Sequence, residues 1–253
     1  MGLSATWSNE GQSMTTYPEL NFLTPERHKD WLAVVGEPAS EEEINAANQI
    51  RQVFVRNENP HPYMVDLLRA FRVLRSAKTY IEVGTRDKGN VAYVSELMDP
   101  YATIVDIDLN QDPSTEALLR KKIAESQTYI AIEGNSISDH VIHQVSQRVP
   151  LGSVDAVFLD SNHMYFHFLN EIDRYLPFVR AGGWVIAHDV LWEGTSEQKG
   201  KAYACELVDR HWPVYLVNGN RPITRFMRHQ KNEAVWGSIG IFQKPNNNNL
   251  GEI

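Results

Sequence analysis

The strongest constraint on the fold of this 253-residue chain is the segment Tyr80–Asn90, which reads YIEVGTRDKGN. In it, an apolar run meets an acidic residue, then Gly84 and Gly89, and then the start of a helical pattern. Glycine permits a tight turn and close approach of the backbone to a ligand, and the first turn of a helix has free N–H groups. The segment therefore predicts a strand, a turn and a helix start that together suit a nucleotide-like ligand.

From residue 78 onward, short apolar runs alternate with amphipathic stretches. This alternation is typical of a parallel β-sheet covered by helices on both faces. Two later apolar runs, 214–217 and 237–242, suit antiparallel edge strands. Strands are expected near residues 79–83, 102–107, 128–132, 154–159 and 183–188, and helices near residues 89–98, 114–126, 137–148, 164–176 and 197–211.

The residues before this alternation predict helices of their own. Ser40, followed by three glutamates, indicates a helix start, because a hydroxyl caps the helix and acids favour its first turn. A second helix is expected from about Pro62. We therefore divide the chain into N-terminal arm and helices at 1–76, suited to a lid or an oligomer contact, a ligand-binding domain at 77–245, and a disordered polar tail at 246–253.

Composition narrows the class of ligand. The formal net charge of -8 and the sequence pI of about 5.6 give no electrostatic footprint for nucleic acid or for an anionic membrane. Cys205 is the only cysteine, so an internal disulfide is impossible and a reducing compartment is natural. The sequence shows no basic and apolar leader and no stretch of membrane-spanning length. We expect a cytoplasmic protein that acts on a small molecule.

The turn itself lacks the G-x-G-x-x-G pattern of dinucleotide sites, since TRDK separates its glycines. It resembles motif I of class I S-adenosyl-L-methionine (SAM) methyltransferases, to which Glu82 and Gly84 match directly, while residues 86–88 depart from it. The resemblance implies a Rossmann-like SAM-methyltransferase fold, with a mostly parallel seven-stranded sheet, helices on both faces and an N-terminal helical extension. An ordinary strand, turn and helix of any doubly wound domain is the alternative. The contacts to SAM that the motif implies are Glu82, Gly84, Thr85 and Asn90.

Polar residues follow the next two expected strands, at the edge where open α/β sheets bind ligands. The second strand ends in Asp106 and Asp108, and a carboxylate there can accept hydrogen bonds from both ribose hydroxyls. Resemblance to the family favours Asp106 for this role, with Asp108 as the alternative. Asn135 and Ser136, after the third strand, match the family segment that contacts adenine, or else they cap the next helix.

The fourth and fifth expected strands end in potential metal ligands. Asp160 ends the fourth strand, with His163 three residues on, and His188 and Asp189 end the fifth. Together they resemble the site of the metal-dependent small-molecule O-methyltransferases, which include catechol O-methyltransferase, antibiotic-sugar O-methyltransferases and cephalosporin hydroxylase-like proteins. The resemblance covers roughly residues 78–190. It implies metal ligands at Asp160, His188 and Asp189, with Asp160 also beside SAM.

His163 falls where the catechol enzyme carries its catalytic lysine, and imidazole is a competent base near neutral pH. We therefore predict that His163 is the catalytic base, the alternative being a local hydrogen bond at a helix start. His163 and His167 also form a His-x-x-x-His pair, expected on one helical face, that weakly resembles a zinc half-site.

His188 departs from the family, which usually places an oxygen ligand there, the kind that Mg²⁺ prefers. The metal is then Mn²⁺ or Fe²⁺, which accept imidazole, or Asp160 and Asp189 hold Mg²⁺ while His188 faces the substrate, or no metal binds and a histidine acts alone. The expected cofactors are SAM and a divalent metal, for which Mg²⁺ is the first expectation and Mn²⁺ or Fe²⁺ the alternatives.

The function predicted is therefore a SAM-dependent O-methyltransferase that acts on a hydroxyl of a small natural product, such as a sugar or a phenol. A metal-independent or N-directed methyltransferase that uses a histidine base, and a non-catalytic SAM-binding subunit, are the alternatives. His61, Trp192 and Glu193 are candidates for the acceptor pocket. A homo-oligomer is expected, because relatives often assemble through their N-terminal helices.

Overall fold

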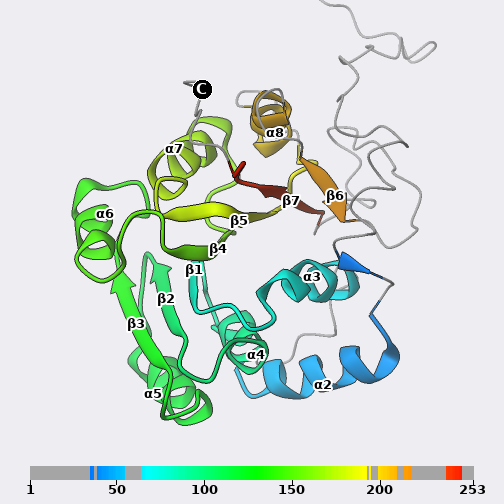
Figure 1. Ribbon diagram of the computed structural model, residues 1–253, viewed down its shortest axis with the longest axis vertical. Coiled ribbons are helices and arrows are strands. Elements are labelled where there is room, and N and C mark those ends of the chain that lie inside the picture. Colours follow the sequence, from blue (N-terminus) through cyan, green and yellow to red (C-terminus); the bar gives the residue numbers. More distant parts are fainter. Residues whose placement is uncertain are drawn as a thin grey trace, which may run out of the picture.

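The computed structural model describes residues 35–36, 39–54, 64–192, 194, 199–209, 214–217 and 238–246 (Figure 1). Several sequence-based expectations lie outside the described residues. They are the arm before residue 35, the start of the helix expected from Pro62, the tail at 247–253, and two candidates for the acceptor pocket, His61 and Glu193.

A seven-stranded sheet of order β3-β2-β1-β4-β5-β7-β6 confirms the predicted α/β fold. Strands β1 to β5 pair in parallel, and β7 pairs antiparallel with both β5 and β6. The strand order reverses between β1 and β4, and ligands of doubly wound sheets bind at such a reversal. The strands are β1 Thr79–Val83, β2 Thr103–Asp108, β3 Thr128–Glu133, β4 Val154–Leu159, β5 Val179–His188, β6 Tyr215–Val217 and β7 Ile239–Gln243.

The fifth strand begins earlier than the sequence predicts. It starts at Val179 rather than near residue 183, because Val179 already pairs with Val154 before the register shifts towards Ala156. Gly182, whose φ of 70° favours glycine, lies in this irregular stretch inside the strand.

Helices cover both faces of the sheet (Figure 1). Buried residues of α6, α7 and α8 join one hydrophobic core, which includes Cys205, and buried residues of α2, α3, α4 and α5 join the other. No described helix has the length and apolar character needed to cross a membrane. The helices are α2 Glu41–Gln52, α3 Met64–Phe71, the short 3₁₀ helix η2 Arg72–Leu74, α4 Gly89–Leu97, α5 Pro113–Lys122, α6 Asp139–Ser146, α7 Tyr165–Tyr175 and α8 Lys201–Asp209.

The N-terminal helices share a core with the sheet. The ring of Phe71, on α3, meets the ring of Phe158, on β4, edge to face at a centroid distance of 5.3 Å. The predicted start of α2 is confirmed, since Ser40 Oγ accepts a hydrogen bond from Glu43 N and Ser40 N donates to Glu43 Oε2. Phe71 thus joins α3 to the sheet, and Ala47 of α2 belongs to the same hydrophobic core, on the face that α4 also covers.

The turn after β1 packs on the end of β4 through Gly84. Its φ is 87°, and a β-carbon there would lie 2.4 Å from the backbone oxygen of Asp160. Backbone hydrogen bonds join the same region to both neighbouring strands, from Gly84 N to Ile107 O and from Asp160 N to Val83 O, each at 2.8 Å. Glycine is therefore required both by the positive φ and by the close backbone approach.

Gly84→Ala should destabilise the protein more than Gly152→Ala. Both residues have positive φ, but a β-carbon on Gly152 would meet nothing within 4 Å. Gly152→Ala should cost only the strain of a left-handed alanine, about 1–2 kcal/mol, whereas Gly84→Ala must also displace rigid backbone. Denaturant unfolding of both variants measures the difference, and equal losses would contradict the close approach.

Candidate active site

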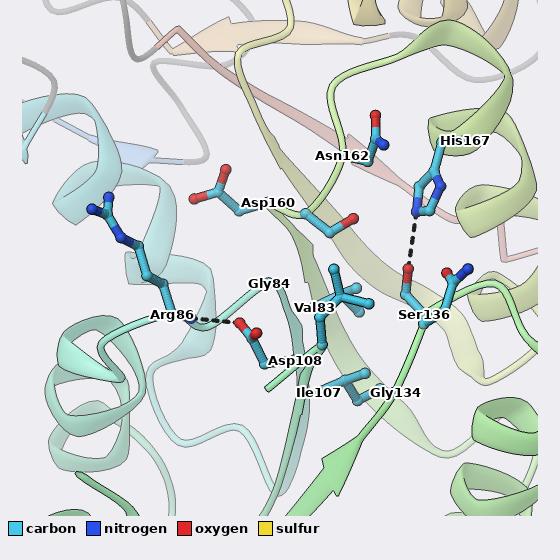
Figure 2. Close-up of a pocket in the computed structure, with 13 residues that line it drawn as sticks. Val83, Gly84, Arg86, Ile107, Asp108, Gly134, Ser136, Asp160, Asn162 and His167 are labelled. Carbon is cyan, nitrogen blue, oxygen red and sulfur yellow. Dashed lines mark hydrogen bonds between the residues drawn. The ribbon is translucent and has the colours of Figure 1, made fainter. Parts of the chain in front are cut away.

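A cavity of about 530 Å³ lies at the edge where strands β1 to β4 end (Figure 2). This is the place at which the strand order reverses. The cavity brings together several residues that the sequence predicted as SAM contacts. It is lined by Val83, Gly84, Arg86, Ile107, Asp108, Leu109, Gly134, Asn135, Ser136, Asp160, Ser161, Asn162 and His167.

Glu82 lies beneath the cavity wall rather than on it. Its side chain is fully buried, and its Oε2 accepts a hydrogen bond of 2.8 Å from the hydroxyl of Tyr80. Its other carboxyl oxygen has no hydrogen-bond partner among the described residues. Burial, helped by the nearby charges of Asp106 and Asp160, raises the pKa of Glu82 well above its ordinary value, although the Tyr80 hydroxyl opposes the shift. The folded protein therefore keeps the Glu82 proton to a higher pH than the unfolded chain does.

Asp106 and Asp108 have different surroundings. Asp106 is fully buried and does not line the cavity. Asp108 lines the cavity, and its Oδ2 accepts a hydrogen bond of 2.7 Å from Arg86 N, as Figure 2 shows. The carboxylate of Asp106 accepts hydrogen bonds from Thr85 Oγ1, Lys88 Nζ, Gln111 Nε2 and the hydroxyl of Tyr129.

Lys88 pairs with Asp106, the residue that the sequence favoured as the contact to ribose. It has left-handed backbone, with φ at 63°, just before α4, and its ammonium reaches under the turn to the buried carboxylate of Asp106. Residues 86–88, where the sequence departs from the family motif, thus supply the cation that occupies Asp106. Thr85 belongs to the same buried network, and Asn90 lies on α4 away from the cavity lining.

The end of β3 places Asn135 and Ser136 on the cavity. The cap of α6 is Ser138, whose Oγ accepts a hydrogen bond from Val141 N, so neither Asn135 nor Ser136 is the helix cap. Asn135 Oδ1 accepts a hydrogen bond of 3.2 Å from Ile137 N, whereas the hydroxyl of Ser136 points towards α7.

The ends of β4 and β5 bring two carboxylates and two imidazoles into one cluster. Asp160 Oδ1 lies 2.8 Å from His188 Nδ1 and 3.4 Å from His163 Nε2. His163 Nδ1 lies 3.1 Å from Asp189 Oδ2. One potential ligand atom from each of Asp160, His163 and His188 falls within 4.8 Å of the others. This group of three contains two of the predicted ligands, Asp160 and His188, together with His163, which was predicted as the base, whereas Asp189 lies beside it.

Asp160 remains ionised in this cluster. Burial acts to raise the pKa of its carboxyl, but the neighbouring imidazoles of His188 and His163 outweigh that effect and hold the pKa well below its usual range. An ionised carboxylate between two imidazoles is a ready anionic ligand. Asp189 has left-handed backbone, with φ at 55°, which is uncommon for a residue other than glycine and is frequent at functional sites.

The two histidines of the His-x-x-x-His pair do not share a helical face, contrary to the sequence-based expectation. His163 precedes α7, which begins at Tyr165, whereas His167 lies within it. His167 Nε2 instead lies 3.3 Å from Glu171 Oε1. The pair therefore belongs to two separate clusters and forms no zinc half-site.

Lys201 is a site residue that sequence reasoning missed. It is fully buried at the start of α8, and its ammonium donates to the backbone oxygens of Leu159 and His188, each at 3.1 Å. These residues directly precede Asp160 and Asp189, so the lysine ties together the strand ends that carry the cluster. The preceding residue, Gly200, is a glycine because a β-carbon there would lie 2.3 Å from the backbone oxygen of Trp192. No sequence pattern around residue 200 indicates that Lys201 contacts the ends of β4 and β5.

Residues 63–232 match the family described as Rhamnosyl O-methyltransferase/CmcI. The chain belongs to this family. The predicted resemblance to SAM-dependent O-methyltransferases is thereby confirmed. The matched residues include the turn after β1 and the ends of β4 and β5.

A curated protein matches part of the chain. Uncharacterized protein R132 of Acanthamoeba polyphaga mimivirus is 25% identical over 118 residues, which are 44% of this chain and 51% of that protein. The chain thus spans about half the length of that curated relative.

Two solved structures show the same fold. An O-methyltransferase from Bacillus cereus in complex with SAH is 14% identical, with a TM-score of 0.53 over 89% of this chain and 100% of that one. MycE methyltransferase from the mycinamycin biosynthetic pathway, in complex with Mg, SAH and mycinamycin VI, is 16% identical, with a TM-score of 0.52 over 87% of this chain and 57% of that one.

Asp106→Asn and Asp108→Asn should separate fold support from ligand binding. Asp106→Asn leaves the buried charge of Lys88 without its carboxylate and should cost about 3–5 kcal/mol of unfolding free energy. Asp108→Asn should change that free energy by no more than about 1 kcal/mol and weaken SAM binding. Urea unfolding and calorimetric titration of SAM measure both effects. Weaker SAM binding with unchanged stability in Asp106→Asn would reverse the assignment.

Glu82→Gln should become more stabilising as the pH rises. The unfolded chain releases the Glu82 proton near pH 4.3, whereas burial keeps it bound in the folded state, so the wild type loses stability from about that pH upward. Glutamine has no such proton to keep. Urea unfolding at pH 5, 6, 7 and 8 should show the variant gaining on the wild type, and a difference that does not change with pH would contradict the raised pKa.

Proposed function

We propose that this member of the Rhamnosyl O-methyltransferase/CmcI family transfers the methyl group of SAM to a hydroxyl oxygen of a small molecule, aided by a divalent cation. The observation that carries the proposal is the position of Asp160. It lines the cavity, and its carboxylate also joins His163 and His188 in the cluster. One shared side chain therefore sets the methyl donor beside the cation, as an in-line displacement requires.

The cavity fits SAM in size and in the residues at its edge. Its volume of about 530 Å³ lies within the range of small-molecule sites. Asp108, as the acid on the cavity wall, takes the ribose role, and Gly84 lets the backbone approach the ligand. Asn135 and Ser136 take the adenine end. Asp106 and Thr85 support the turn from beneath, and Glu82 and Asn90 stay outside the proposed contacts.

The proposed cation ligands are Asp160, His163 and His188. Asp189 orients His163, because its Oδ2 lies beside the ring nitrogen that faces away from Asp160. Carboxylates commonly hold metal-binding histidines in this way. The proposal differs from the sequence-based expectation, in which Asp189 is a ligand and His163 is the base.

The donor set fits a divalent metal, and its chemistry points to which one. Two imidazoles and a carboxylate suit Mn²⁺ or Fe²⁺ better than Mg²⁺, which prefers oxygen ligands. A divalent cation held here supplies Lewis acidity that lets an acceptor hydroxyl lose its proton near neutral pH. The chain contributes the charge of Asp160 and the fixed strand ends that Lys201 joins.

A small hydroxylated natural product, such as a sugar or a phenol, is the proposed acceptor. The ring of Trp192 lies 6.0 Å from that of His163 and offers an apolar surface beside the cluster. The formal net charge of -8 does not favour nucleic acid as a substrate. We propose further that the enzyme works in the cytoplasm as a homo-oligomer.

The same geometry supports one second candidate, a metal-independent methyltransferase. The carboxylate of Asp189 lies 3.1 Å from His163 Nδ1 and would orient the imidazole as a general base. Titration with metals separates the two candidates.

Binding of cations to the SAM complex tests the proposal. Chelator-treated protein is titrated with SAM by calorimetry and then with Mn²⁺, Mg²⁺ or, without oxygen, Fe²⁺. We expect saturable binding of Mn²⁺ and Fe²⁺, lost in His163→Gln and retained in His167→Gln, because only His163 belongs to the cluster. Asp189→Asn, which removes an orienting group, should weaken metal binding by about 10–100-fold.

Methyl transfer is followed as formation of SAH from SAM with panels of phenols and sugars. Product that depends on Mn²⁺ or Fe²⁺ would support the proposal. Product without metal, abolished in His163→Gln, would favour the second candidate, and absence of SAM binding would refute both.

A further inference from the structure

Two serine hydroxyls on the cavity wall share one buried acceptor. Ser136, after β3, and Ser161, after β4, both line the cavity. Ser136 Oγ donates a hydrogen bond of 2.6 Å to Glu171 Oε1, and Ser161 Oγ donates to the same oxygen. Glu171 belongs to α7 and is fully buried. The acceptor thus lies behind the wall, on the side away from any ligand in the cavity.

His167 completes this group and leaves its polarity unchanged. Its Nε2 lies 3.1 Å from Ser136 Oγ and 3.3 Å from Glu171 Oε1 (Figure 2 shows the contact with Ser136). If Nε2 carries a proton, it donates into the group, and if it does not, it is a second acceptor for Ser136. In either tautomer the hydroxyl proton of Ser136 is held within the group and not directed into the cavity.

The result is that this part of the wall presents two hydroxyls that can accept hydrogen bonds from a ligand but not donate to it. A serine hydroxyl has one proton and two lone pairs, so a hydroxyl that donates to Glu171 offers only lone pairs to a ligand. A ligand N–H group matches such a wall, whereas a ligand carbonyl would meet oxygen lone pairs and lose its own hydrogen bond.

We propose that Glu171 is a positioning residue for base specificity, which fixes Ser136 and Ser161 as acceptors for the exocyclic amine of adenine. The inference rests on the proposed binding of SAM in this cavity, with the ribose at Asp108 and the base towards Ser136. It assigns to the buried carboxylate the selection of a 6-aminopurine over a 6-oxopurine. The cation cluster takes no part in it.

The test compares two ligands whose bases differ in the group at C6 and, as a consequence, in whether N1 carries a proton. SAH carries the C6 amino group, and S-inosylhomocysteine carries a carbonyl in its place. The wild type should bind SAH at least about tenfold more tightly, since the carbonyl leaves buried polar groups unpaired. Calorimetric titration of both ligands into the metal-free full chain gives the ratio of the two affinities. A variant that damages the cavity in general would weaken both ligands equally and leave this ratio unchanged.

Glu171→Met removes the acceptor and frees both hydroxyls to turn towards the cavity. The affinity ratio should then fall about tenfold, towards one. Glu171→Gln, which keeps a carbonyl oxygen for the serines, should restore the preference for SAH. A wild-type ratio in folded Glu171→Met would overturn the inference.

The double variant Ser136→Ala, Ser161→Ala tests the same point at the cavity wall, in case Glu171→Met does not fold. It should lose affinity for SAH while affinity for S-inosylhomocysteine changes little, and unchanged discrimination would overturn the inference. Equal wild-type affinity for the two ligands would overturn it while leaving the proposed function intact. Failure of either ligand to bind would refute the proposed SAM site as well.

Discussion

The backbone of Gly84 lies against the backbone of Asp160 at the point where the strand order of the sheet reverses. Because no side chain separates them, the turn after β1 and the end of β4 form one continuous edge. The cavity opens along that edge, and the carboxylate of Asp160 reaches from it to the two imidazoles. The relative placement of the cavity and the cluster thus depends on a backbone contact that only glycine allows.

Buried charges hold this edge in place. Lys88 and Asp106 form an ion pair beneath the turn, and Lys201 donates to backbone oxygens at the ends of β4 and β5. Burying charged groups is costly unless they are paired or hydrogen-bonded, and removal of one partner exposes that cost. The strand ends at the site are therefore held by buried polar contacts whose loss would be costly.

Much of this arrangement could be predicted from the sequence, because it is written in local patterns. The alternation of apolar runs with amphipathic stretches predicted the parallel strands, and the polar residues after them predicted which strand ends carry chemistry. Gly84, Asp160 and His188 needed only this reasoning, since a residue that ends or follows a strand must lie at the edge of the sheet. The serine and glutamate pattern at Ser40 likewise predicted the start of α2 from contacts three residues apart.

The rest depended on contacts between distant segments. Asp106 and Asp108 look alike in the sequence, but Asp106 is buried against Lys88 whereas Asp108 lies on the cavity wall. His163 and His167 belong to different clusters because α7 begins between them. Glu171 and Lys201 make polar contacts with distant segments, and the apolar patterns of their helices give no sign of these contacts. No local pattern carries such information, since each contact depends on where two elements are packed in three dimensions.

The position of Lys201 links movement at the start of α8 to the cluster. Its ammonium sits at the first residue of the helix and holds the carbonyls that precede both Asp160 and Asp189. Any displacement of that helix end must stretch or break a hydrogen bond to each strand. The position of the start of α8 and the positions of the groups that follow both strands are therefore coupled through one buried ammonium.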